Sequence, residues 1–215
     1  MRMFVDVNIK KVETLFGDDM RGIKRLVVCP INSIFEKFEC ERVSKGWWNV
    51  KFIGDTAIVK SPVASHVKDT VAFLDGLEEV LVIGFCGSVS DSMPGEIVTV
   101  NESFFNGLII KAEPFEDFFS KRFYLSNNFC EQESEDFLLI LKNNLVDCVD
   151  METHYVFEEV SRRGIICRGI YVVTDHLVKA PFYESHDFFV DSILKMVEFV
   201  DGYIRNDDDD SNMLE

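Results

Sequence analysis

Three carboxylates stand where predicted elements begin or end in the stretch 149–176, which reads VDMETHYVFEEVSRRGIICRGIYVVTDH. Asp150 and Glu152 lie at the start of a predicted helix, and Asp175 lies at the end of the predicted strand that follows. Ligands of open α/β sheets bind outside the carboxyl ends of strands, so these side chains are candidates for one shared pocket. A structural role is the alternative, because an acid in a first helical turn complements the helix dipole and an aspartate after a strand commonly forms a turn. Residue types and spacing leave both interpretations open.

Hydrophobic spacing predicts the helix and the strand that position these carboxylates. Tyr155, Val156 and Val160 recur at helical spacing. Gly164 follows two arginines and is a typical stop signal at a helix C-terminus. Residues 165–173 are rich in β-branched and apolar side chains, which predicts a central strand buried on both faces. The polar residues therefore begin where a buried strand ends.

The rest of the chain alternates predicted strands with predicted helices. Strands are expected at 25–29, 79–85, 96–100 and 122–129, a β-hairpin at 47–60, and helices at 34–38, 67–76, 134–145 and from about residue 185. Residues 101–121 are irregular and rich in phenylalanine, so a loop or lid is expected there. This order predicts one α/β domain with a mixed, largely parallel central sheet and helices on both faces. The domain is expected to span 1–205, and the acidic residues 206–215 to form a disordered tail.

Apolar stripes assign the buried faces of two of these helices. The helix at 134–145 is expected to bury Phe137, Leu141 and Leu145. The last helix is expected to bury one stripe, which consists of Phe189, Ile193, Met196, Val197, Val200 and Ile204.

Composition limits the partners and the compartment. The formal net charge of -16 argues against nucleic acid or an anionic membrane as a partner, although a local site can still hold a small anion. The six cysteines are scattered without a CxxC pair or metal-type spacing, which predicts reduced thiols, a cytoplasmic location and no metal or cofactor. The N-terminus lacks the apolar core of a signal peptide, and no apolar run approaches the length of about 20 residues that a membrane span needs.

Three segments carry a resemblance to a known family. Residues 80–100 (VLVIGFCGSVSDSMPGEIVTV) combine a strand, a Gly-rich turn and a Pro-Gly-Glu-Ile-Val strand, 149–165 contain the Val-Asp-Met-Glu helix start, and 172–176 (VVTDH) form a Thr-Asp strand end. In this order and spacing they resemble the nucleoside phosphorylase/nucleosidase superfamily. That superfamily includes purine nucleoside and uridine phosphorylases, methylthioadenosine/adenosylhomocysteine nucleosidases and futalosine hydrolase. The resemblance covers nearly the whole chain and implies the family's three-layer α/β fold.

The resemblance implies roles for residues at matching positions. Asp175 matches the aspartate that acts as general acid on the N7 side of the purine, where the departing base develops negative charge. Met151 and Glu152 match the pair that holds the ribose, since a carboxylate can accept hydrogen bonds from two hydroxyls. Phe129 falls where the family stacks an aromatic ring on the base. The implied substrate is a purine-type nucleoside.

Departures from the family pattern lie at the phosphate site. Phosphorylases use a Gly-Asp-Pro-x-x-Arg type of turn after the first strand, where this chain has Ile31 in place of the glycine and Phe35 in place of the arginine. Val82 stands at a second arginine position and Phe85 at a serine position. An apolar pocket cannot take up a phosphate dianion without a penalty of roughly several kcal/mol. Phosphorolysis is therefore disfavoured, and hydrolysis is the expected reaction.

The hydrolytic branch of the family positions its water with a glutamate after the first strand. Glu36 is the nearest candidate in this sequence. The nucleophile pocket is expected to be formed by Phe85, Cys86, Gly87 and Ser88, where Ser88 offers a hydroxyl or only completes a turn. His154 replaces a small residue of the family and either packs in the core or reaches the sugar.

Two other hypotheses remain open. One is a phosphorylase whose anion site is rebuilt from arginines such as Arg21, Arg25 or Arg122. The other is a relative without catalytic activity that binds a nucleoside or serves in an assembly. The family pairs its subunits so that a neighbour often completes the pocket, which implies a homodimer.

Overall fold

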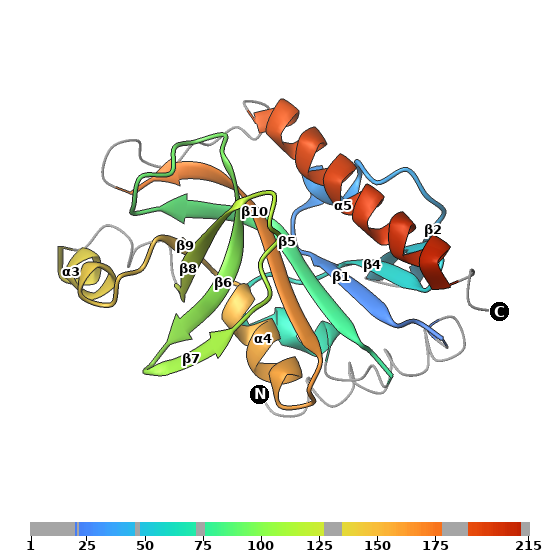
Figure 1. The fold of residues 1–215 in the computed structure, drawn as a ribbon, viewed down its shortest axis with the longest axis horizontal. Coiled ribbons are helices and arrows are strands. Elements are labelled where there is room, and N and C mark those ends of the chain that lie inside the picture. The colour runs from blue at the N-terminus through green and yellow to red at the C-terminus, as the bar shows by residue number, and fades with distance from the viewer. Residues whose placement is uncertain are drawn as a thin grey trace.

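The computed structural model describes residues 20, 22–45, 48–71, 76–126, 135–177 and 189–211. The strands are β1 (Arg25–Cys29), β2 (Arg42–Lys45), β3 (Trp48–Ile53), β4 (Thr56–Lys60), β5 (Glu79–Ser88), β6 (Ile97–Phe105), β7 (Leu108–Lys111), β8 (Phe119–Leu125), β9 (Cys148–Asp150) and β10 (Ile166–His176). The helices are α2 (Asn32–Phe35), the 3-10 helix η1 (Ala64–Thr70), α3 (Glu135–Asn143), α4 (Thr153–Ser161) and α5 (Val190–Ser211). Figure 1 shows these elements gathered around one sheet.

The sheet has ten strands and combines a parallel half with a closed ring. Its order is β10-β6-β8-β9-β5-β1-β4-β3-β2, with β7 paired to β6. Strand β5 also pairs with β10, so the five strands β10, β6, β8, β9 and β5 close on themselves. Strands β4, β1, β5 and β10 run parallel, so their carboxyl ends meet at one edge. This edge is the expected ligand-binding edge of an α/β sheet.

Helices cover both faces of the parallel half because successive residues of its strands point to opposite sides. On one face, Leu26 and Val28 of β1 belong to a core shared with Val156 and Val160 of α4. On the other face, Val27 belongs to a core shared with α5 and α2. In Figure 1, α5 runs across one side of the sheet and α4 lies on the other. The predicted fold class, an α/β domain with a mixed sheet and helices on both faces, is confirmed.

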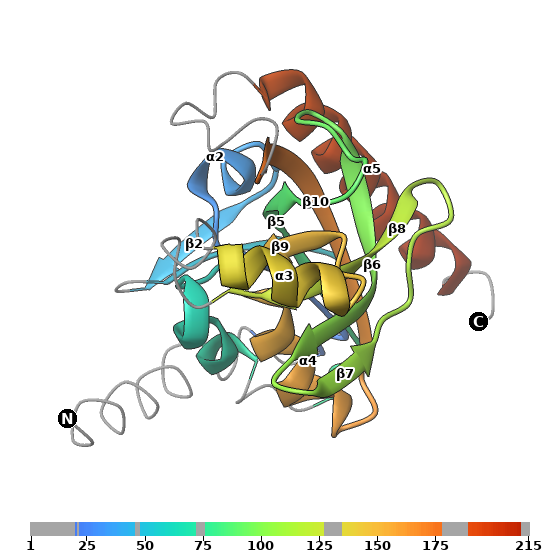
Figure 2. The same ribbon diagram turned by 90° about the vertical axis from the view of Figure 1, so that its left-hand side faces the viewer.

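Helix α3 covers one end of the molecule. Its buried residues Phe137 and Leu141 pack with Val149 of β9, and Tyr124 of β8 lies against the same cluster. Figure 2 shows α3 in front of the ring strands and well separated from α5. No described helix is long and apolar enough to cross a bilayer.

Several sequence predictions hold in detail. Strand β1 has the predicted bounds, and the hairpin of β3 and β4 turns at Gly54-Asp55. Gly164 ends the α4 region with a φ of 72°, in the left-handed region that glycine favours. The whole predicted stripe of α5 is buried, from Phe189 to Ile204.

Other predictions are wrong. Residues 101–121 do not form a loop or lid, because they contain the end of β6, all of β7 and the start of β8. Leu145 does not face the core: it is 78% exposed, and its φ is 53°. The short strand β9 was not predicted. Helix α5 runs from Val190 to Ser211.

Candidate active site

Asp175 lies at the carboxyl end of β10, in register with Gly87 of β5. The register of the two strands shifts between Val173 and Asp175, an irregularity of the kind that changes the direction of a side chain. Asp175 is 5% exposed, and its Oδ1 accepts a hydrogen bond from the Thr174 hydroxyl at 2.9 Å. Burial raises the pKa of Asp175 above its ordinary value, and the Thr174 hydrogen bond opposes this rise. Such a carboxyl is suited to hold a proton and to donate it.

The end of β5 forms the backbone next to Asp175. Gly87 pairs with Asp175 on one side and with Val149 of β9 on the other. A Cβ on Gly87 would stand 2.9 Å from Asp175 Oδ2, so the carboxylate lies directly against this backbone. Ser88 is fully buried, and its hydroxyl has no hydrogen-bond partner among the described residues. The structure thus brings Gly87 and Ser88 of the predicted nucleophile pocket to the same edge as Asp175.

Cys86 is buried in β5, next to Gly87. Burial raises the pKa of its thiol well above the usual value, and the neighbouring Cys148 thiol raises it further. The carboxylates of Asp150 and Asp175 both add to the rise. Phe85 is partly buried on the opposite face, against the core of α5.

Asp150 ends β9 and anchors the N-terminus of α4. Its Oδ2 accepts hydrogen bonds from the backbone amides of Glu152 at 3.1 Å and Thr153 at 2.7 Å, and from the Thr153 hydroxyl at 2.5 Å. Burial raises the pKa of Asp150, and these hydrogen bonds lower it. The structural role considered for an acid at a helix start therefore applies to Asp150. Its Oδ1 is buried without a partner among the described residues.

Glu152 is buried beside Asp150, at 9% exposed. Its Oε1 accepts a hydrogen bond at 2.8 Å from the backbone amide of Ala64, the first residue of η1. Ala64 has a φ of 52°, a left-handed conformation that costs energy for an alanine. Burial, together with the charge of Asp150, raises the pKa of Glu152 to about 7. The backbone hydrogen bonds of Ala64 and Met151 to this carboxylate oppose the rise.

Tyr171 completes the polar network beneath this edge and was missed by the sequence analysis. It is 1% exposed in the middle of β10, and its hydroxyl lies within hydrogen-bonding distance of the Thr153 hydroxyl and 3.3 Å from Asp150 Oδ2. Burial raises the pKa of Tyr171 well above its ordinary value, so the phenol stays protonated. The available signal was a tyrosine inside an aliphatic strand, because a buried phenol needs a hydrogen-bond partner.

The structure does not bring Glu36 to this cluster. Glu36 follows α2, and its side chain is 44% exposed. Its Oε1 accepts a hydrogen bond at 2.9 Å from Arg42 of β2, the edge strand at the far end of the sheet from β10. The expectation that Glu36 positions a water next to Asp175 therefore has no support from this geometry. Met151 lies next to Glu152 and is partly buried, and Phe129 lies outside the described residues.

The positions expected to bind phosphate in a phosphorylase are apolar in space as well as in sequence. Phe35 and Val82 are both fully buried in the core. Arg25 lies at the amino end of β1, opposite the Asp175 edge, and pairs with Glu79 at 2.7 Å. Arg122 pairs with Glu102 and donates to the Asn144 carbonyl. Neither described arginine of the rebuilt-anion-site hypothesis is free to hold a phosphate at this edge.

His154 packs in the core between α4 and β6. It is 1% exposed, its Nδ1 lies 2.9 Å from the Ser103 hydroxyl, and its ring is 5.7 Å from that of Phe105. Burial lowers its pKa, so the ring is neutral near pH 7. Within the described ranges, no three histidine, cysteine or acidic side chains are grouped to hold a metal ion.

Comparison with solved structures shows which proteins share this fold. The 5'-methylthioadenosine/S-adenosyl homocysteine nucleosidase of Campylobacter jejuni matches with a TM-score of 0.67 at 12% identity, over 83% of this chain and 97% of that one. The futalosine hydrolase of Helicobacter pylori matches with a TM-score of 0.68 at 13% identity, over 86% and 99%. The S. pneumoniae nucleosidase bound to a transition-state inhibitor matches with a TM-score of 0.61 at 11% identity, over 80% and 93%.

These matches show that the chain shares the fold of these nucleosidases, as the sequence resemblance implied. Comparison of the sequence with known protein families and with curated proteins finds no match. The chain therefore has the same architecture as these nucleosidases at low sequence identity.

Proposed function

We propose that this protein cleaves the N-glycosidic bond of a purine-type nucleoside by hydrolysis. The observation that carries the proposal is a pair of buried carboxyls with raised pKa values, Asp175 at the carboxyl end of β10 and Glu152 at the start of α4, bonded to Ala64 beyond the carboxyl end of β4. This pair stands in a fold shared with nucleosidases that act on methylthioadenosine or futalosine. Two carboxyls in different environments are a usual basis for dividing acid and binding roles in glycosidic cleavage.

The proposed mechanism gives each carboxyl a separate role. Asp175, whose pKa is raised by its burial, donates a proton to the departing base and neutralises the charge that develops on it. Glu152, which the Ala64 amide holds in place, accepts hydrogen bonds from ribose hydroxyls. Water attacks the sugar carbon as the bond to the base breaks. The unpartnered hydroxyl of Ser88 at this edge is a candidate to hold that water.

Hydrolysis is favoured over phosphorolysis by the charge distribution. Phe35 and Val82 stand where phosphate-binding arginines are expected, and both are buried in apolar surroundings. Arg25 and Arg122 are engaged by Glu79 and Glu102. A phosphate dianion bound here would lose its hydration without gaining a matching cation.

The test is a panel of purine nucleosides, methylthioadenosine and futalosine, incubated with the purified protein with and without phosphate. Chromatographic detection of free base in the absence of phosphate is the expected result. Base release that requires phosphate would reject the hydrolytic reaction and the anion-site argument with it.

A nucleoside-binding protein without turnover is the second candidate. The observation that favours it is the surface position of Glu36, which leaves no glutamate of the α2 region beside Asp175. This candidate predicts that a nucleoside of the panel raises the thermal unfolding temperature while no base is released. Base release would exclude it.

Assembly as a homodimer in the cytoplasm is part of the same proposal. The dimer follows from the family resemblance, and light scattering on the eluted protein measures it directly. The location is supported by the cysteines, since those in the described residues are free thiols, namely Cys29, Cys40, Cys86, Cys148 and Cys167.

A further inference from the structure

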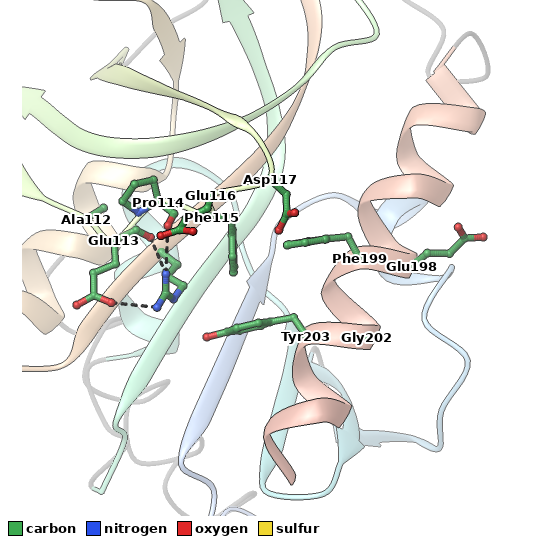
Figure 3. Close-up of a pocket in the computed structure, with 11 residues that line it drawn as sticks. Ala112, Glu113, Pro114, Phe115, Glu116, Asp117, Glu198, Phe199, Gly202 and Tyr203 are labelled. Carbon is green, nitrogen blue, oxygen red and sulfur yellow. Dashed lines mark hydrogen bonds and ion pairs between the residues drawn. The ribbon is translucent and has the colours of Figure 1, made fainter. Parts of the chain in front are cut away.

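A second hollow lies at the opposite edge of the sheet from Asp175. It occupies about 800 Å³ between the segment 112–117, which joins β7 to β8, and one side of α5. Arg168, near the amino end of β10, lies beneath it. Figure 3 shows the segment on one side, the helix on the other, and the rings of Phe199 and Tyr203 projecting between them. We call this hollow the α5 groove.

Both walls of the α5 groove are held in place by hydrogen bonds to the sheet. On the segment side, Arg168 donates to the carbonyls of Glu113 at 3.1 Å and Pro114 at 3.4 Å, and the Phe115 amide donates to the Thr99 hydroxyl at 3.2 Å. On the helix side, Tyr203 donates to the buried carboxylate of Glu79 at 2.9 Å. The groove is therefore a preformed feature of the fold.

The α5 groove carries uncompensated negative charge. The charge of Arg168 is already balanced, since its guanidinium pairs with Glu79 at 2.8 Å and with Glu113 at 2.9 Å. Three further carboxylates line the groove without an ion-pair partner among the described residues, and these belong to Glu116, Asp117 and Glu198. The groove therefore favours a cationic ligand.

Aromatic rings give the α5 groove an apolar wall. Phe199 makes edge-to-face contacts with Phe115 and Phe118, with 5.1 Å and 4.8 Å between the ring centroids. Tyr203 makes the same kind of contact with Phe115, at a centroid distance of 5.0 Å. Figure 3 shows Asp117 and Phe199 reaching toward each other across the groove. Carboxylates next to rings suit the side chains of lysine and arginine, which combine an apolar stem with a charged end.

Gly202 keeps the α5 groove open. It lies inside helix α5 and lines the groove between Phe199 and Tyr203. Glycine weakens a helix interior relative to alanine, yet a Cβ at this position would meet no atom within 4 Å. Packing therefore gives no reason for a glycine here, whereas an occupant of the groove does.

We propose that the α5 groove docks an extended basic segment, carrying lysine or arginine next to apolar residues, from a partner protein. The groove is open to solvent, whereas a small-molecule pocket encloses most of its ligand. A second copy of this chain is disfavoured as the occupant of this acidic groove, because acidic residues outnumber basic ones by 38 to 22 in the sequence. The site is separate from the Asp175 edge, so docking does not depend on the proposed hydrolase activity.

Fluorescence anisotropy with labelled peptides tests the proposal. The probes are a set of pentapeptides in which lysine or arginine alternates with leucine, phenylalanine or valine, with glutamine in place of the basic residues as the control set. At least one basic peptide is expected to bind saturably, with affinity that falls as salt rises, and its glutamine counterpart is expected not to bind. No saturable binding of any basic peptide would overturn the proposal.

Variants of the groove separate docking from general attraction to an acidic protein. Gly202→Leu fills the groove and should weaken binding by at least about tenfold, while Gly202→Ala should weaken it less. Glu116→Gln should weaken binding, and Asp191→Asn, which removes an equal charge from α5 outside the groove, should not. Equal binding by wild type and Gly202→Leu would overturn the proposal, as would self-association that Gly202→Leu abolishes. Circular dichroism and base release, expected to be unchanged, show that the variants are folded.

Discussion

Asp175 Oδ2 lies 2.9 Å from the point where a Cβ on Gly87 would stand, closer than side-chain carbons approach one another in folded proteins. Gly87→Ala is therefore expected to move the carboxylate and to lower the rate of base release by at least about tenfold, because catalytic groups depend on position. Stability should change little, since the displaced atom ends a side chain. Rate measurements and thermal unfolding test this, with Gly202→Ala as a matched control whose Cβ meets nothing. A wild-type rate for Gly87→Ala would contradict the close contact.

Asp175→Asn is expected to lower the rate of base release by roughly 10²–10⁴-fold, because an amide cannot deliver a carboxyl proton to the leaving base. Since burial raises the pKa of Asp175, kcat/KM of the wild type should fall as pH rises through that elevated pKa. A pH profile of both proteins checks this. Undiminished turnover by Asp175→Asn would remove Asp175 from the acid role.

Glu152→Gln should change both substrate binding and the pH dependence of stability. The carboxyl titrates near its ordinary value of 4.5 in the unfolded chain and at about 7 in the folded chain. Between these values the folded state binds more protons, so the free energy of unfolding of the wild type falls as pH rises from 4.5 to about 7. In Glu152→Gln this pH-dependent fall in the free energy of unfolding should be absent, because the amide does not titrate.

Urea unfolding of wild type and Glu152→Gln at the two ends of this pH range measures the difference. The variant should gain stability relative to wild type at the higher pH, while its KM for the nucleoside rises. An identical pH dependence in both proteins would show that Glu152 is not strained by burial, and an unchanged KM would argue against its contact with the ribose.

Gly169→Ala is expected to destabilise the ring of strands, because its Cβ would stand 2.5 Å from Val100 Cγ2. Overpacking of this kind costs about 1–3 kcal/mol in the free energy of unfolding. Val100→Ala removes the opposing methyl groups, so the double variant should be less destabilised than the sum of the two single variants. Chemical denaturation of all four proteins measures this coupling, and strict additivity would refute the contact.

Leu145→Gly is expected to raise the free energy of unfolding by about 1 kcal/mol. Leu145 occupies the position after α3 where Val146 donates to the Leu141 carbonyl, an arrangement that favours glycine because φ is positive. Its side chain is 78% exposed, so little packing is lost. Leu145→Ala retains a Cβ and serves as the control. A destabilised glycine variant would show that the leucine side chain makes a compensating contact.

Local sequence patterns predicted the strands and helices in which a whole run or stripe of apolar side chains is buried. Strand β1 and helix α5 were placed correctly because apolar residues form a short run in one and a helical stripe in the other. Asp175 was found because the polar residues begin abruptly at the end of β10. These signals need no knowledge of the rest of the chain.

Elements defined by distant partners were not predicted. Strand β9 has three residues and exists through pairing with β5 and β8. Strand β7 has one buried residue, Ile110, so it lacks the alternation of buried and exposed side chains by which a strand is recognised in a sequence. Glu36 was predicted to position the water because it follows β1 closely in the sequence. In the structure its side chain is instead hydrogen-bonded to Arg42 of the edge strand β2, a contact that the sequence does not reveal.

The pairing of β5 with β10 has a consequence for how the protein folds. Val82 pairs with Gly169, and Gly87 pairs with Asp175. In the sequence, strands β6, β8 and β9 all lie between these two paired strands. Contacts between such distant residues require closure of long loops, which slows folding relative to local structure. The edge that carries Asp175, Ser88 and Glu152 is thus expected to form late in refolding, after α4 and α5 have acquired helical structure.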